Sequence, residues 1–311
     1  MTNAGGLGCL ASGYVSPERL ADDIAAARAA TTGPIGVNLF VPQPSVAEVH
    51  LLDHYADVLD DLAEHYGVEV GYPKFGDDDG WKQKLEVVAD LRPEMVSFTF
   101  GAPPPDVMRW FGALGMLLFN TVTSAYEAGV ALAAGADGLI VQGPDAGGHR
   151  GTFAPDMDPG TESLYELLAR IRSAHDVPLI AAGGLGTPDD VAAVLNRGAV
   201  AAQIGTALLL SEEAGTNAAH RAALQHPEFV KTVVTRAFSG RYARGLENDF
   251  TRLFDDIAPL GYPEVNQMTS PIRKASVALE DPHGTNLWAG TAYRAARPGP
   301  AKDIVKTLGD V

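Results

Sequence analysis

The feature that most constrains the fold of this chain is a regular alternation of short apolar runs with longer segments of helical period. Almost every residue in these runs is apolar, as expected for strands that are buried on both faces. The helical segments begin with N-cap signals, such as Ser16 before Pro17 and Thr187 before Pro188. The alternation therefore predicts repeated βα units on a parallel sheet. The predicted strands lie at residues 7–11, 35–40, 95–100, 116–122, 138–142, 178–182 and 201–206.

The fold class that fits this pattern is an α/β fold, a TIM-type (β/α)8 barrel with a smaller inserted domain. Seven strands are predicted where the barrel needs eight, and the first begins soon after Met1, so we expect the barrel to lack its first strand. Residues 211–274 are charged and of helical period, with no clear strand. We expect them to form a mainly helical insertion or cap domain, while residues 1–210 and 275–311 form the barrel. A long helix is also expected over residues 45–66.

The composition excludes several classes of function. There are 39 acidic and 23 basic residues, so the formal net charge is −16, and nucleic acids and membrane surfaces are poor partners. No apolar run reaches the roughly 18 residues that a membrane helix needs, and the N-terminal residues lack the pattern of a signal peptide. Cys9 is the only cysteine, which excludes an internal disulfide and a cysteine-based zinc site. These features predict a cytoplasmic protein.

Two glycine-containing loops follow consecutive predicted strands. One contains Gly183 and Gly184, and the other is Gln203-Ile204-Gly205-Thr206. Loops after the last strands of a (β/α)8 barrel often bind a phosphate, because glycines let backbone N–H groups approach the ligand. The first loop lacks the GxGxxG pattern of a Rossmann dinucleotide site. We favour a phosphate site over the alternative that the glycines only permit tight turns.

The most informative segment runs from Gln142 to Gly151 and follows the predicted strand at 138–142. Gly147 and Gly148 let the backbone pass close to a flat ligand. They also present His149 from a loop at the end of a strand, where barrel enzymes bind their substrates. His149 is therefore the candidate catalytic residue. A metal role is not expected, because no second histidine lies at ligand spacing and the acidic run 77–79 lacks the alternating ligands of a calcium loop; we expect that run to be a solvated turn.

Asn38 is a polar residue near the end of an otherwise apolar predicted strand. A buried amide without a partner costs about 1–3 kcal/mol, so its side chain must form hydrogen bonds. Neighbouring parts of the chain and the edge of a cofactor ring are both suitable partners. The sequence leaves these two alternatives open.

Taken together, these segments resemble the nitronate monooxygenases, formerly called 2-nitropropane dioxygenases. Members of that family have a (β/α)8 barrel with a smaller inserted domain and bind FMN without covalent attachment. They also have a further strand and helix at the start of the barrel, before the unit with which this chain begins. The resemblance rests on the segments AGGLGCLASGY at 4–14, GVNLFVP at 36–42, TVTS at 121–124, VQGPDAGGHRG at 141–151, IAAGGLG at 180–186, QIGT at 203–206, VTRAFSGRYARG at 234–245 and NLWAG at 286–290.

The resemblance implies that the chain oxidises alkyl nitronates, such as propionate 3-nitronate, with O2 to nitrite and a carbonyl compound. His149 would be the catalytic residue, as a base toward a nitroalkane or as an orienting group for a nitronate. Asn38 and Gln142 would hydrogen-bond the flavin ring system, with the loop at Gly147 close to the cofactor. The FMN phosphate would be held by Gly183, Gly184, Gln203, Ile204, Gly205 and Thr206.

Three other functions compete with this interpretation. A flavin-dependent enoyl-acyl-carrier-protein reductase shares the barrel and FMN, but it would consume NAD(P)H and offer a basic patch to an acidic carrier protein. A dehydrogenase of the IMP type needs a cysteine nucleophile on a rim loop, whereas Cys9 lies inside a predicted strand, so we set it aside. A truncated, non-catalytic flavin-binding protein is the third. The expected partners are a small nitronate and O2, and the sequence leaves open whether the chain forms a homo-oligomer.

Overall fold

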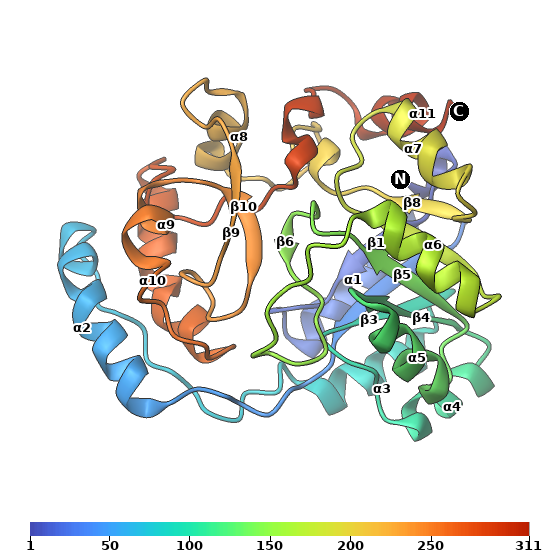
Figure 1. Ribbon diagram of the computed structural model, residues 1–311, viewed down its shortest axis with the longest axis horizontal. Coiled ribbons are helices and arrows are strands. Elements are labelled where there is room, and N and C mark those ends of the chain that lie inside the picture. Colours follow the sequence, from blue (N-terminus) through green and yellow to red (C-terminus); the bar gives the residue numbers. More distant parts are fainter. Residues whose placement is uncertain (311) are drawn as a thin grey trace.

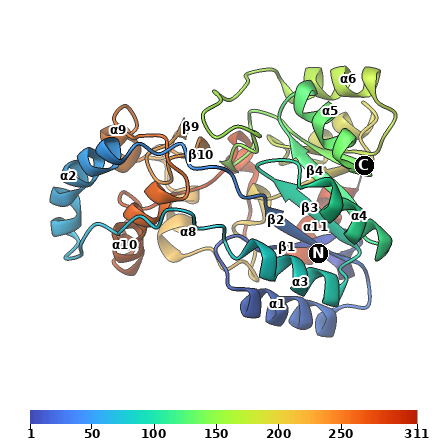
Figure 2. The ribbon, with the colours of Figure 1, turned by 90° about the horizontal axis from the view of Figure 1, so that it is seen from below.

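The computed structural model describes residues 1–310, and its larger lobe is built on a curled parallel sheet of seven strands, a TIM-barrel-like α/β arrangement (Figures 1 and 2). Each strand pairs with the next one of this sheet along the chain, in the order β1-β2-β3-β4-β5-β7-β8. All seven predicted runs are confirmed as strands. Their bounds are β1 (Gly8–Ala11), β2 (Ile35–Phe40), β3 (Met95–Thr99), β4 (Leu117–Val122), β5 (Gly138–Gln142), β7 (Leu179–Ala182) and β8 (Ala201–Gln203).

Helices connect these strands and pack against the outer face of the sheet. The predicted N-caps are confirmed: the Ser16 side chain accepts a hydrogen bond from Arg19 N, and Thr187 forms a capping box with Asp190. Apolar side chains of the strands and helices form the core between them. The helices of this lobe are α1 (Pro17–Ala30), α3 (Trp81–Leu91), α4 (Pro105–Ala113), α5 (Ala125–Ala134), α6 (Leu164–Ala174), α7 (Pro188–Leu195) and α11 (Ala301–Gly309).

The sheet is open between β1 and β8. Within residues 1–310, each of these strands has only one hydrogen-bonded neighbour. A cavity of about 1240 Å³ lies between them, lined by apolar side chains of both strands, of α7 and of α11. Figure 1 shows the N-terminus beside β8 on this side of the molecule.

A second, smaller lobe lies beside the sheet (Figure 2). It contains a three-stranded antiparallel sheet in the order β6-β10-β9, made of β6 (Gly148–His149), β10 (Ala243–Leu246) and β9 (Thr232–Thr235). Its helices are α2 (Val49–His65), α8 (Ala218–Gln225), α9 (Asp249–Phe254) and α10 (Glu264–Ala278). The prediction that residues 211–274 contain no clear strand is therefore wrong. Both strands there are short, and β9 and β10 do not carry the long apolar run by which the larger sheet was identified.

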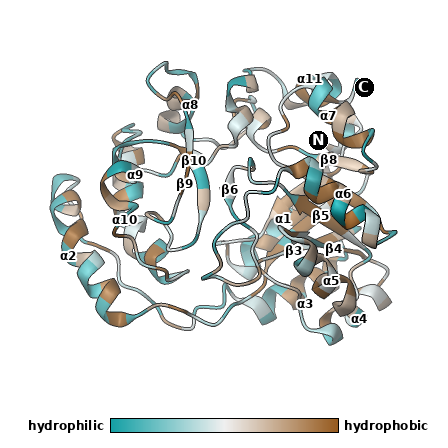
Figure 3. Cartoon of the chain, in the orientation of Figure 1, coloured by the Kyte–Doolittle hydropathy of each residue, from teal (hydrophilic) through white to brown (hydrophobic). Residues whose placement is uncertain are grey.

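The predicted long helix at 45–66 is confirmed as α2. We expected residues 1–210 to form the barrel, so the packing of α2 against the smaller lobe was not predicted. The buried face of α2 packs into the core of the smaller lobe, where Tyr55 and Leu59 lie with Phe238 and Met268. Figure 3 shows that α2 has both hydrophobic and hydrophilic residues along its length, whereas β3 to β5 are mainly apolar. The smaller lobe is thus built from two segments that are far apart in the sequence.

The acidic run 77–79 joins the two lobes and is only partly the solvated turn that we expected. The Asp79 carboxylate lies 2.6 Å from Nζ of Lys84, whose side chain is only 2% exposed, and it accepts a hydrogen bond from Tyr14 N. Asp77 accepts a hydrogen bond of 2.8 Å from Nε2 of Gln267 in α10. Burial raises the pKa of Asp79, so this ion pair is part of the packed structure.

No helix within residues 1–310 is both long enough and apolar enough to cross a membrane.

The open edge of the sheet gives a testable prediction. Backbone amides of β1 and β8 should exchange with D2O at least about tenfold faster than those of β3 and β4, because an edge strand opens more easily than one paired on both sides. Hydrogen exchange followed by mass spectrometry measures this. Equal protection of β1 and β4 would contradict the open arrangement and would mean that another segment or molecule covers the edge.

Candidate active site at the carboxyl ends of the strands

A cavity of about 450 Å³ lies at the carboxyl ends of the parallel strands, and most of the predicted site residues line it. Ile204 is the exception: it lines the separate cavity between β1 and β8 and packs against the hydrophobic core. The predicted residues that the fold brings together here are Asn38, Gln142, Gly147, His149, Gly183, Gly184, Gln203, Gly205 and Thr206.

The loop that carries His149 is held from both lobes. Gly148 and His149 form β6, and His149 pairs with Ala243 of β10 in the smaller lobe. On the barrel side, Gln142 Nε2 donates to the His149 carbonyl at 3.0 Å, and Gln142 Oε1 accepts from Gly151 N at 2.9 Å. The Gln142 amide is therefore bonded at both ends to this loop, so its first role is to shape the loop around His149.

Aromatic side chains surround the His149 ring. The ring centroids of Phe100, Tyr262 and Trp288 lie 5.8, 5.5 and 5.5 Å from that of His149. Nε2 of His149 also lies 2.8 Å from Oγ of Ser239. No pattern in the sequence marked Phe100, Tyr262, Trp288 or Ser239 as a neighbour of His149. Ser239 and Trp288 lie in two of the segments that carry the family resemblance, and this is the one sequence signal that could have identified them.

Positive charge is concentrated next to His149. Arg150 and Arg241 are each 1% exposed, and Arg241 lies over the face of the Phe100 ring at 4.0 Å. Arg241 donates to the carbonyls of Arg150 and Thr152, and the partly buried Arg273 bonds only to neutral oxygens of Thr269, Asn266 and Asn286. None of the three arginines forms an ion pair with a carboxylate in the part of the chain that the structure describes.

This environment sets the charge of His149. Burial, together with the charges of Arg241 and Arg273, lowers the pKa of His149 to about 3. The imidazole is therefore neutral near pH 7, with one nitrogen that donates and one that accepts. A small anion placed beside it would be attracted by Arg241 and Arg273.

Asn38 projects its amide from β2 into the cavity. Its Oδ1 accepts hydrogen bonds from Ser97 Oγ at 2.8 Å and from Thr99 Oγ1 at 3.0 Å. Side chains of the neighbouring strand thus satisfy the carbonyl, which answers half of the question that the sequence left open. Nδ2 forms no hydrogen bond within residues 1–310, so its two N–H groups are available to a ligand.

The glycines of the two loops differ in what they permit. Gly183 and Gly184 have φ of +106° and +73°, which L side chains rarely adopt, and they pack against the loop at Asp145. At Gly205 a Cβ atom would meet nothing within 4 Å, so this position borders open space in the cavity. Glycine is required at position 147 for a different reason. A Cβ atom there would lie 2.4 Å from Gly290 N, so the adjacent backbone leaves no room for a side chain.

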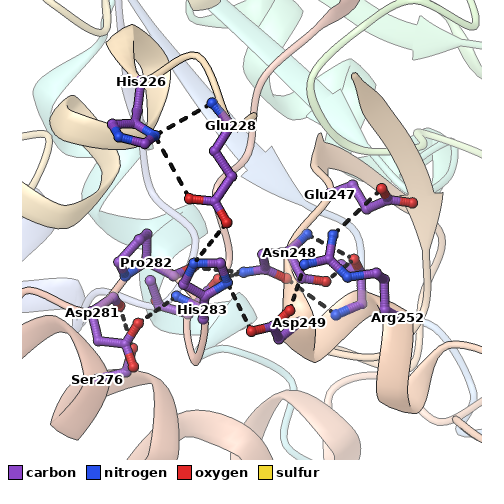
Figure 4. Close-up of polar contacts among 12 residues, drawn as sticks. His226, Glu228, Glu247, Asn248, Asp249, Arg252, Ser276, Asp281, Pro282 and His283 are labelled. Carbon is purple, nitrogen blue, oxygen red and sulfur yellow. Dashed lines mark hydrogen bonds and ion pairs between the residues drawn. The ribbon is translucent and has the colours of Figure 1, made fainter. Parts of the chain in front are cut away.

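A second group of titratable side chains lies in the smaller lobe and does not line the cavity (Figure 4). His283 Nδ1 lies 3.1 Å from Asp249 Oδ2, and Glu228 lies 3.7 Å from both His283 and His226. Among residues 1–310, no group of three or more histidine, cysteine or acidic side chains has an arrangement that could hold a metal ion. These contacts link the α8–β9 loop to the loop after α10.

Comparisons with known proteins agree on one family. The family model described as nitronate monooxygenase matches residues 1–310. A nitronate monooxygenase of Pseudomonas aeruginosa is 37% identical, with 99% of this chain and 90% of that protein covered. A probable nitronate monooxygenase of Staphylococcus aureus is 32% identical, with 99% of this chain and 88% of that protein covered.

Solved structures give the same picture. A nitroalkane oxidase from Streptomyces ansochromogenes superposes with a TM-score of 0.95 at 43% identity, covering 99% of this chain and 88% of that one. FabK from Thermotoga maritima superposes with a TM-score of 0.74 at 24% identity, covering 98% and 84%, which shows a common fold alone. The family model and the relatives establish that this chain belongs to the nitronate monooxygenase family of oxidoreductase enzymes.

Proposed function

We propose that this protein is an FMN-dependent nitronate monooxygenase, which oxidises alkyl nitronates such as propionate 3-nitronate with O2 to a carbonyl compound and nitrite. The observation that carries this proposal is the single cavity in which a neutral His149, the free N–H groups of Asn38 and the open space at Gly205 meet. Membership of a flavin-dependent family supports it. We also propose that the fold is a (β/α)8-type barrel whose eighth position lies in the gap between β1 and β8.

The residues present fit FMN. Gly205 borders open space with room for a phosphate, and Gly183, Gly184, Gln203 and Thr206 line the same cavity and would complete the cradle. Thr206 Oγ1 already accepts a hydrogen bond from Gly290 N, which ties this loop to the chain that passes over Gly147. Asn38 would donate to the polar edge of the ring system. Bound FMN would supply the electron acceptor for the oxidation, while the chain positions the substrate.

The electrostatics of the site favour an anionic substrate. Arg241 and Arg273 give a positive potential at His149, and neither forms an ion pair with a carboxylate within residues 1–310. A nitronate carries its negative charge on the nitro oxygens, so this potential stabilises it in the cavity. The aromatic rings of Phe100, Tyr262 and Trp288 restrict the space beside His149 to a small substrate.

The first prediction concerns His149. The variant His149→Ala should keep its FMN, while turnover of a neutral nitroalkane falls by about 10²–10⁴-fold, the range that removal of a general base produces. Turnover of a preformed nitronate should fall much less, because its carbon has already lost the proton. Nitrite release from both substrates, normalised to bound flavin, measures the difference. NAD(P)H oxidation should remain negligible, and rapid NAD(P)H oxidation by the unmodified protein would instead favour the reductase.

Two results would count against this role. Equal losses with both substrates would mean that His149 orients the substrate and does not remove a proton. Unchanged turnover of both would remove His149 from the catalytic residues and leave its loop as a wall of the cavity.

The second prediction concerns the phosphate cradle. Gly205→Leu should reduce FMN retention at least about tenfold, because its side chain would fill open space that the phosphate needs. Gly215→Leu is the matched control: Gly215 is exposed, also has no atom within 4 Å of an added Cβ, and does not line the cavity. Flavin released from the purified variants measures the effect. Full FMN content in folded Gly205→Leu would contradict the assigned cradle.

The third prediction concerns pH. The pKa of His149 is lowered to about 3, so the free enzyme carries neutral His149 at every pH above that value. For a nitronate that stays ionised throughout, kcat/KM should therefore show no inflection due to His149 between about pH 6 and about pH 9. An inflection near the ordinary histidine pKa of about 6.5 that disappears in His149→Gln would show that burial does not control this residue.

A further inference from the structure

Ser239 lies directly behind the His149 ring, in the connection between β9 and β10. Its side chain is 1% exposed, and its Oγ lies 2.8 Å from His149 Nε2. The same Oγ donates a hydrogen bond of 3.1 Å to the carbonyl of Arg241. Ser239 is thus fixed by its own segment of the smaller lobe and contacts the imidazole with a defined atom.

The hydrogen bonds of Ser239 point to one tautomer of His149. A serine hydroxyl has one hydrogen, and the Ser239 hydrogen is directed to the Arg241 carbonyl. Oγ therefore accepts at the 2.8 Å contact, and His149 Nε2 carries the proton that is donated. Because the imidazole is neutral, Nδ1 then holds the lone pair. Nδ1 forms no hydrogen bond within residues 1–310, so its lone pair is available to a ligand.

The surroundings of His149 prevent the ring from exchanging its two nitrogens. Gln142 and Ala243 hold the backbone of His149 from opposite sides, and Phe100, Tyr262 and Trp288 pack around the ring. Arg241, which accepts the Ser239 hydrogen at its carbonyl, also donates to the carbonyls of Arg150 and Thr152 just after His149. The segment from Ser239 to Arg241 therefore forms hydrogen bonds with both the His149 ring and the loop that carries it.

We infer that Ser239 is a positioning residue that holds His149 as the Nε2–H tautomer, so that Nδ1 is the ring nitrogen that accepts a proton from a neutral nitroalkane. This inference rests on the proposed function. In the step concerned, the proton on the carbon next to the nitro group moves to Nδ1. The electron pair of that C–H bond remains with the substrate and delocalises onto the nitro oxygens, so a neutral nitroalkane and imidazole become a nitronate and an imidazolium. Oxidation of the nitronate by O2 then follows as for an added nitronate.

The tautomer can be measured without any turnover. Long-range ¹H–¹⁵N correlation spectra of the whole protein, labelled with ¹⁵N-histidine, distinguish a protonated ring nitrogen from an unprotonated one, and His149→Gln identifies the His149 signals. We expect a protonated Nε2 and an unprotonated Nδ1 at neutral pH. A protonated Nδ1 in the unmodified protein would overturn the inference, and this result does not depend on whether the Ser239 variant folds.

The second arm tests the role of Ser239. Ser239→Ala removes the acceptor of a buried N–H group, so the Nε2–H population should fall and kcat for a nitroalkane should drop about tenfold, a typical effect of one lost buried hydrogen bond. The nitroalkane KM and nitronate turnover should change less than about threefold. Ser276→Ala is the control, since Ser276 is also a fully buried serine of the smaller lobe and donates to the Asp281 carbonyl away from the cavity (Figure 4).

The outcomes separate the two claims. An unchanged tautomer and unchanged nitroalkane turnover in folded Ser239→Ala, or an equal effect of Ser276→Ala, would overturn the positioning role. A protonated Nε2 in a protein that oxidises neither substrate would support the assigned tautomer while the proposed function fails.

Discussion

The site depends on the pairing of a barrel loop with a strand of the other lobe. Gly148 and His149 leave the parallel sheet after β5 and join β10, opposite Arg244 and Ala243, and Arg150 N donates to the Tyr242 carbonyl at 2.8 Å. Each such hydrogen bond contributes only about 1 kcal/mol net. Their importance is geometric, because they place His149 between the strand ends of the barrel and the aromatic and hydroxyl groups of the smaller lobe. A change in how the lobes pack would move His149 relative to both.

Charge is distributed unevenly between the surface and the site. The chain as a whole has a formal net charge of −16, yet Arg150 and Arg241 are almost fully buried beside His149. Burial of a guanidinium is costly unless its N–H groups are bonded, and here backbone carbonyls accept most of those bonds. Carbonyls satisfy most of the donors without cancelling the charge, while Arg150 Nε and Arg241 Nη1 have no hydrogen-bond partner within residues 1–310. The result is a neutral imidazole in a positive field, which suits the binding of a small anion.

Much of the fold followed from local pattern, and the part that did not depends on long-range packing. The seven strands of the large sheet were predictable because strands buried on both faces have a continuous apolar run. β9 and β10 are short, β9 is partly exposed and β10 contains Arg244 and Gly245, so their sequences carry no comparable run. The sequence also did not predict that α2 packs in the smaller lobe. Its amphipathic period predicts a helix with one buried face, but only tertiary contacts decide that Tyr55 packs against the smaller lobe.

The candidate site shows the same division. Glycines and a histidine at strand ends were visible because the carboxyl ends of parallel strands meet at one edge, and the fold brings nearly all of them to one cavity. Three features of the site could be found only in the structure. The adjacent backbone at Gly290 requires glycine at position 147. The side chain of Gln142 forms hydrogen bonds with its own loop, and Ile204 lines another cavity. The neighbours of His149 come from distant segments, and no local pattern marks Ser239 or Trp288 as its contacts.

The central claim is that this cavity oxidises a nitronate with the help of a bound FMN. The most direct measurement is to saturate the purified chain with FMN, add propionate 3-nitronate under air, and record nitrite released and O2 consumed, without NAD(P)H. The account predicts saturable nitrite release that requires FMN and is accompanied by O2 consumption. An FMN-saturated, folded chain that releases no nitrite above the protein-free background would contradict it.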